Sequence, residues 1–313
     1  MSVGPAFLTR PPASPLSVMG TVLLALVPGA LVLFEAYGLG VVSNLVVALA
    51  AALATEALAL QLTGGAPMRA LRDGSAIVTG VLLALALPPG LHPGIVALAS
   101  VAAIGLGKHA YGGLGQNPFN PAVVGYVIVL VSFPAALSFW PSAVDALSGA
   151  TAMTTFKYRA GATVAEVWSS SRGFGALGGT PAEWANAAFL AGGLFLAWRR
   201  LLAWRVPVAF LATLGALGLA GYDQGSSSSF GSPAYHAFSG GTMLAAWFFA
   251  TDPVTHPAGR RAQIAFGVII GVVTWSIRSF GGYPDGIAFG ILLANGASAW
   301  LDRPSGTSTE TRA

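Results

Sequence analysis

Long apolar runs separated by short polar turns are the feature that most constrains this chain. The first two runs, about 17–35 and 40–62, are each long enough to cross a membrane, because a helix needs roughly 20 apolar residues to span the hydrocarbon core. Only 8% of the 313 residues are charged, whereas a soluble domain usually carries about 25%. The sequence therefore predicts an all-α polytopic membrane protein.

Ten segments satisfy or approach this length, and the third and the eighth are short and end in proline. They are about 17–35, 40–62, 74–89, 92–108, 120–140, 183–198, 206–221, 239–251, 263–279 and 286–301. We expect one transmembrane domain over 17–301, between an N-terminal segment 1–16 and a tail 302–313.

The distribution of Lys and Arg predicts the orientation. If the N-terminus is cytoplasmic, eleven of the fifteen Lys and Arg residues fall on the inner side and four on the outer side. Cytoplasmic loops carry an excess of these residues, so both termini are expected in the cytoplasm. The longest loop, 141–182, then lies outside. It contains aromatic and aliphatic residues that can pack, which argues against a purely disordered excursion.

Cysteine is absent, and the four histidines do not pair at helical spacing within an apolar run. The first fact excludes disulfides, thiolate-held iron–sulfur clusters and a thiol nucleophile within this chain. The second argues against a haem held by two histidines. The net charge of +4 comes from Arg residues at the ends of apolar segments, which is not a nucleic-acid signal. We therefore assign no metal site, no nucleic-acid partner and no catalytic residue.

Ten spans divide into five and five, which predicts an inverted-topology repeat. The fourth span exits through 108–113 and the ninth through 278–283, and both exits contain a cation, an aromatic residue and Gly-Gly. Short, broken spans in matching halves are typical of a central binding site. Chance is the alternative explanation, because the chain contains 41 glycines.

Four motifs lie in loops or at span ends. They are Y-G-G-L-G-Q-N-P-F-N-P-A at 111–122, D-A-L-S-G-A-T at 145–151, A-T-D-P-V-T at 250–255 and I-R-S-F-G-G-Y-P-D-G at 277–286. Together they resemble the D subunits of the Rnf (Rsx) ion-translocating electron-transport complex, within the NqrB/RnfD family. The resemblance spans about 70–301 and extends more distantly to the B subunit of the sodium-pumping NADH:quinone reductase.

The resemblance implies a membrane subunit of an ion-translocating ferredoxin:NAD oxidoreductase complex in the bacterial inner membrane, with its outer loop in the periplasm. The subunit would relay electrons through FMN, coupled to Na⁺ or H⁺ transport, and would hold no complete active site alone. Expected partners are a periplasmic-facing FMN subunit and iron–sulfur subunits. A second, non-covalent flavin (riboflavin) is also expected. The alternatives are a B-type protein of a quinone reductase and a non-redox secondary transporter.

Thr151, the last residue of S-G-A-T, is the expected site of covalent FMN attachment. The resemblance implies a phosphoester between its hydroxyl and the flavin phosphate. Gly149 and Ala150 leave the hydroxyl uncrowded, and Ser148 can donate to a phosphate oxygen. Spacing alone would favour a polar turn followed by a helix N-cap.

Three further polar residues are candidates for contacts to cofactor or helix ends. Lys157 and Arg159 follow the attachment motif closely and are able to balance a phosphate charge. Asn120 is expected to be the N-cap of the fifth span, with Pro121 at the first helical position. A contact from Asn120 to flavin or ion is a further hypothesis.

Two carboxylates are candidates for the ion path. Glu56 lies well inside the second span, where an ionisable residue is a functional-site hypothesis by default. A proton or cation relay is one interpretation, and a neutral, hydrogen-bonded Glu that joins helices is the other. Asp252 ends the short eighth span and is either a second ion-path residue or a helix cap.

Four tryptophans lie near predicted span ends, which is typical of anchors at the membrane interface. They are Trp140, Trp198, Trp204 and Trp300. Stacking on a flavin is the less favoured role for any one of them.

Overall fold

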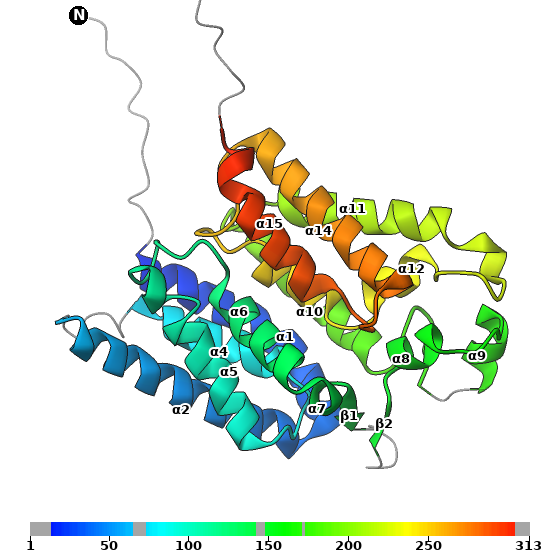
Figure 1. Cartoon of the computed structure of the whole chain (residues 1–313), viewed down its shortest axis with the longest axis horizontal. Helices are drawn as coiled ribbons and strands as arrows, with labels where there is room; N and C mark the ends of the chain where they lie inside the picture. The colour runs from blue at the N-terminus through cyan, green and yellow to red at the C-terminus, as the bar shows by residue number, and fades with distance from the viewer. Residues whose placement is uncertain (1–13, 65–72, 142–147, 171–172, 304–313) are drawn as a thin grey trace, which may run out of the picture.

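The computed structural model describes residues 14–64, 73–141, 148–170 and 173–303, and it is mostly helical (Figure 1). Four helical stretches are long and apolar enough to cross a membrane. They are α1 (Pro15–Tyr37), α2 (Leu39–Leu62), the stretch Pro93–Tyr111 with α5 (Pro93–Gly105) and η2 (His109–Tyr111), and α14 (Arg260–Phe280). The predicted helical membrane class is confirmed.

The remaining helices of the bundle are shorter. They are α4 (Ser75–Ala86), α6 (Pro121–Ser132), α10 (Ala182–Trp198), α11 (Arg205–Ala220), α13 (Thr242–Leu244), the π-helical turn η4 (Ala245–Phe249) and α15 (Ile287–Leu301). The third and eighth segments are short, as predicted, since α4 has 12 residues and the eighth segment is divided between α13 and η4.

Proline and asparagine determine the limits of α6. The Asn120 side chain accepts from the Val123 N–H at 3.2 Å, and Pro121 is the first helical residue, which confirms the predicted cap. The predicted fifth span to residue 140 was too long. Phe133 is not helical, because it precedes Pro134, and only the four-residue α7 (Pro134–Leu137) follows.

The long loop folds into a small unit of its own. Strand β1 (Phe139–Pro141) pairs antiparallel with β2 (Ser148–Ala150), and this hairpin was missed by the all-α prediction. The helices α8 (Ala152–Lys157) and α9 (Val164–Ser170) follow. Met153, Phe156 and Val167 are buried against Tyr235, which lies in α12 (Pro233–Phe238), beyond the short turn η3 (Asp223–Gly225). The expectation that this loop packs is confirmed.

The helices of the two chain halves pack in matching ways. In the first half α2 contacts α4 and α5, and α5 contacts α6. In the second half α11 contacts η4 and α14, and α14 contacts α15. Helix α1 packs against α10 across the halves. The start of α1 and the end of α15 lie far from the hairpin, α8 and α9 (Figure 1).

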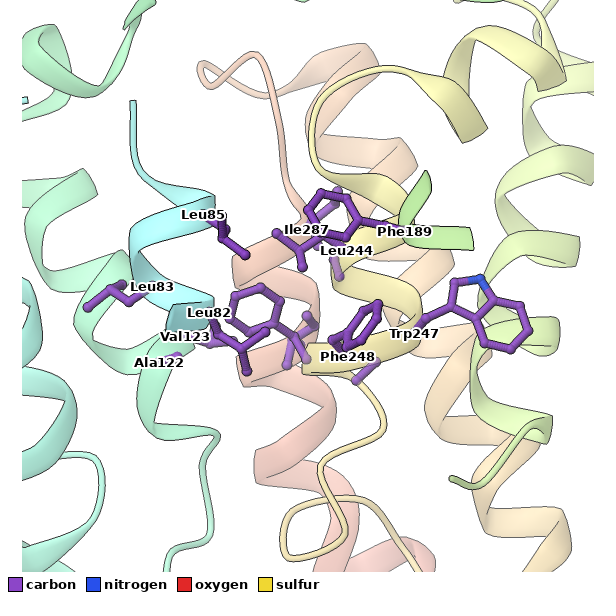
Figure 2. Packing of buried hydrophobic residues seen from close by; sticks show 14 of the residues in the cluster. Leu82, Leu83, Leu85, Ala122, Val123, Phe189, Leu244, Trp247, Phe248 and Ile287 are labelled. Atoms are coloured by element: carbon purple, nitrogen blue, oxygen red, sulfur yellow. The ribbon is translucent and has the colours of Figure 1, made fainter. Parts of the chain in front are cut away.

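The core lies between α4 and α6 of the first half and η4 and α15 of the second half. Figure 2 shows Leu82 of α4 and Val123 of α6 facing Phe248 of η4 and Ile287 of α15. All four side chains are at most 8% exposed. Both halves of the chain therefore contribute side chains to the interior of the bundle. Both halves also contribute residues to the wall of a cavity near this core.

Candidate functional site

Thr151 lies between strand β2 and helix α8. Its hydroxyl oxygen accepts from the Thr154 N–H at 3.1 Å and lies 3.0 Å from the Thr154 hydroxyl. Thr151 is thus the N-cap of α8, as spacing alone predicted. The residue is half-buried. The backbone of Ser148, Gly149 and Ala150 forms β2, and their side chains lie outside the part of the structure that is described.

A cavity of about 500 Å³ lies beside Thr151. Residues of α1, α4, α6, α10, α13, η4 and α15 line it, so both halves contribute walls. Its aromatic lining consists of Tyr37, Tyr126, Trp140, Phe189, Phe249 and Tyr283. The volume falls in the range of small-molecule sites, roughly 300–1,000 Å³, which are mostly apolar with a few polar groups.

Trp140 is positioned in this cavity by the hairpin. It pairs with Gly149 across β1 and β2, and its ring meets Tyr37 edge-on at 5.8 Å. The expected role as an interfacial anchor suits Trp198, which is 76% exposed at the end of α10. Trp140 also lines the cavity, which sequence reasoning did not predict because the strand pairing was not predicted.

Two polar side chains in the cavity wall already have partners. Asn186 accepts from the Met243 N–H at 2.8 Å and donates to the Gly240 carbonyl at 2.8 Å, which holds the start of α13. Asp285 forms an ion pair with Arg278 at 3.0 Å. Asn186 and Asp285 therefore place polar groups in the wall of a cavity whose lining is otherwise mainly apolar and aromatic.

Lys157 and Arg159 do not line the Thr151 cavity. The Lys157 ammonium donates to the carbonyls of Ile277 and Tyr283 at 2.8 and 2.7 Å. Arg159 donates to the Phe156 carbonyl at 2.9 Å and to three further loop carbonyls. The described residues that line the Thr151 cavity include neither cation. This geometry therefore does not support the expectation that Lys157 and Arg159 balance the charge of a phosphate on Thr151.

Arg278 joins three segments of the second half. Besides Asp285, it donates to the His236 carbonyl at 2.7 Å and to the Thr242 hydroxyl at 2.8 Å. The guanidinium is buried at 3% exposure, and Asp285 is 30% exposed. This cluster fixes the start of α13 to the ends of α14 and α12.

Glu56 lies in a buried cluster near the other end of the bundle. The Lys108 ammonium is 2.7 Å from one Glu56 oxygen and 2.8 Å from the Ser75 hydroxyl. His109 Nε2 is 3.0 Å from the second oxygen, but the direction is wrong for a hydrogen bond. The Glu56 and Lys108 side chains are only 2% and 3% exposed. Glu56 is thus ion-paired, which neither interpretation of the sequence had included.

Asn120 and Asp252 stabilise backbone turns. Asn120 donates to the Phe249 carbonyl at 3.1 Å and, through its N–H, to Asn295 Oδ1 at 3.0 Å. Asp252 accepts from the Val254 N–H at 3.1 Å. Asn120 does not line the Thr151 cavity. Asn295 was not a candidate from the sequence, because only folding brings α15 to the start of α6.

This fold and site define a polytopic helical membrane protein whose two halves enclose an aromatic cavity beside a capping threonine. The chain belongs to the NQR2, RnfD, RnfE family, whose model matches residues 7–307. The resemblance inferred from the four motifs is therefore confirmed.

Several relatives with similar sequences carry the name of the D subunit of the ion-translocating oxidoreductase complex. The chain is 46% identical over 305 residues to the protein of that name from Pseudomonas aeruginosa (strain UCBPP-PA14), covering 91% of this chain and 89% of the relative. The proteins of that name from Klebsiella pneumoniae (strain 342) and Escherichia coli O1:K1 / APEC are 41% and 40% identical over 314 residues, with 89% of each chain covered.

Proposed function

We propose that this chain is the D-type membrane component of an ion-translocating oxidoreductase complex and that it carries FMN on Thr151 through a phosphoester. The names of its relatives support the first part. The second part is supported by one observation above the others. Thr151, a half-buried residue, lines a cavity of about 500 Å³ with aromatic walls.

The hydrogen bonding of Thr151 is compatible with esterification. As N-cap, Thr151 uses its oxygen as an acceptor from the Thr154 N–H. Ester formation removes the hydroxyl hydrogen and leaves the oxygen able to accept, so this contact survives. The Thr154 hydroxyl, 3.0 Å away, then acts as the donor in the second contact.

The cavity walls suit a flat aromatic ring. Tyr37 and Trp140 form an edge-to-face pair in the lining, and aromatic surfaces of this kind bind rings through offset or edge contacts. FMN, when bound, supplies electron transfer that side chains cannot perform. The residues of this chain would hold the flavin, exclude water from it and position it between the halves.

We also propose ten spans arranged as a five-plus-five inverted repeat, with both termini in the cytoplasm and the flavin loop in the periplasm. Two contacts support the repeat. Lys108, after α5, donates to Ser75 at the start of α4, and Arg278, at the end of α14, donates to Thr242 at the start of α13, both at 2.8 Å. The excess of Lys and Arg on one side supports the orientation.

Coupling to Na⁺ or H⁺ transport is proposed for the complex as a whole. Glu56 and Asp252 stay candidates for the ion path, although any cation at Glu56 must compete with Lys108 at 2.7 Å. Partner subunits with a periplasmic-facing FMN and with iron–sulfur centres would supply and receive electrons. The second flavin, riboflavin, is part of the same proposal without assigned residues. A contact from Asn120 to flavin or ion stays a separate hypothesis.

Intact-mass analysis tests the flavin attachment. The protein is produced together with a flavin transferase, and its mass should increase by that of FMN less one water. Thr151→Ala should lack both this increase and in-gel flavin fluorescence, whereas Thr154→Val should retain them. An unmodified wild-type mass refutes attachment, and a persistent adduct in Thr151→Ala moves it to another residue.

The intact-mass measurement separates one of the two rival functions. A non-redox secondary transporter would be colourless and carry no adduct, although its broken helices would be similar. A B-type protein of a quinone reductase is in the same family and is separated by its partners. The identity of 40–46% to D subunits over nearly the whole chain favours the D-type assignment.

A further inference from the structure

A second cavity lies on the same side of the molecule as Thr151, between α8, the loop before α12 and the end of α14. Its volume is about 330 Å³, at the small end of ligand sites. Met153 and Pro284 line both cavities, so the two are neighbours. The walls differ in character, because the second cavity is lined by three cations and a run of serines and contains no carboxylate among its described lining residues.

Two of these cations have no acidic partner within the described part of the chain. Arg278 is neutralised by Asp285, but Lys157 and Arg159 donate only to neutral carbonyl groups. Burial lowers the pKa of Lys157, with partial compensation from Asp285, and it lowers the pKa of Arg159 as well. The fold therefore holds two partly desolvated positive charges that an anion would stabilise.

His236 adds an unused polar group to this cavity. Its side chain is 1% exposed, and neither ring nitrogen has a hydrogen-bond partner of acceptable geometry. The Phe230 backbone lies close to the ring, but it only partly offsets burial and Arg278, which lower the pKa of His236 to about 3. The ring is neutral, so it offers one N–H donor. The Ser279 hydroxyl, also in the lining, is equally without a partner.

We propose that this cavity binds a phosphate-type oxyanion. A tetrahedral oxyanion would accept from the remaining Lys157 and Arg159 hydrogens, from the neutral His236 ring and from the serine hydroxyls. The anion has two possible sources, the headgroup of an anionic phospholipid and free phosphate from the aqueous side. This proposed anion site does not require that a flavin is attached to Thr151.

Calorimetry of the full chain in a phosphate-free maltoside detergent tests the proposal. Inorganic phosphate is titrated in one arm. In the other, phosphatidylglycerol is added and retained lipid is counted by native mass spectrometry. Lys157→Met should weaken binding on the order of tenfold, as for a lost hydrogen bond to a charged group, and Lys157→Arg should retain it. The exposed Arg261, at the start of α14, provides the control Arg261→Met, which should bind normally.

A second variant covers the case in which Lys157→Met fails to fold. His236→Leu removes the ring nitrogens and one backbone contact to Phe230, and it should also weaken binding. Saturable binding of phosphate alone identifies a free anion, and retention of phosphatidylglycerol identifies a lipid headgroup. Absence of binding in both arms, or wild-type affinity in both variants, overturns the proposal. Protein produced without the flavin transferase should bind equally well, so failure here is separate from failure of flavin attachment.

Discussion

The buried pair between Glu56 and Lys108 makes a sharp prediction about stability. Lys108→Met would leave the Glu56 carboxylate at 2% exposure without its cation, and the Ser75 hydroxyl would lose its donor at 2.8 Å. Removing one partner of a buried ion pair costs about 3–5 kcal/mol, because an uncompensated charge stays inside. We therefore expect the free energy of unfolding to fall by about this amount.

Equilibrium unfolding in mixed micelles, with increasing SDS and the fluorescence of the eight tryptophans as the signal, measures this change. The double variant Glu56→Gln with Lys108→Met removes both charges and should recover much of the loss, since a neutral replacement of a buried pair is often tolerated. Arg261→Met, which removes an exposed cation, should change stability by less than about 0.5 kcal/mol.

Two results would refute this reasoning. One is a Lys108→Met variant that is no less stable than Arg261→Met. The other is a double variant whose loss of unfolding free energy equals the sum of the losses in Lys108→Met and Glu56→Gln alone. That result would show no coupling between the two charges.

Two further predictions concern packing and pH. At Gly192 in α10 a Cβ would lie 2.0 Å from the Ala25 carbonyl of α1, whereas at Gly20 nothing lies within 4 Å. Gly192→Ala should therefore cost about 1–3 kcal/mol by overpacking, and Gly20→Ala should not destabilise in the same unfolding assay. Glu166 accepts from the Thr163 N–H and hydroxyl at 2.8 and 2.9 Å, and these bonds lower its pKa. A carboxylate whose pKa is lowered in the folded state stabilises the fold at neutral pH. This stabilisation is lost as the pH falls below about 4. Hydrogen exchange in α9 should rise over that range, and an equal rise in Glu166→Gln would contradict it.

The sequence by itself determined the class, the family and several helix limits. Apolar runs of membrane length, few charges and prolines at segment ends have local causes, so they are visible without a structure. Asn120 followed by Pro121 predicted the start of α6 for the same reason. The turn and cap at Thr151 were also predictable, because N-caps depend on neighbouring backbone groups.

The tertiary structure decided which distant residues meet. Glu56 and Lys108 are 52 positions apart and form one pair, and Lys157 donates to carbonyls 120 and 126 positions away. The hairpin that carries Trp140 to the cavity depends on pairing across a loop. Such contacts are selected by the packing of whole helices and by the need of buried polar groups for partners, and no local pattern records either.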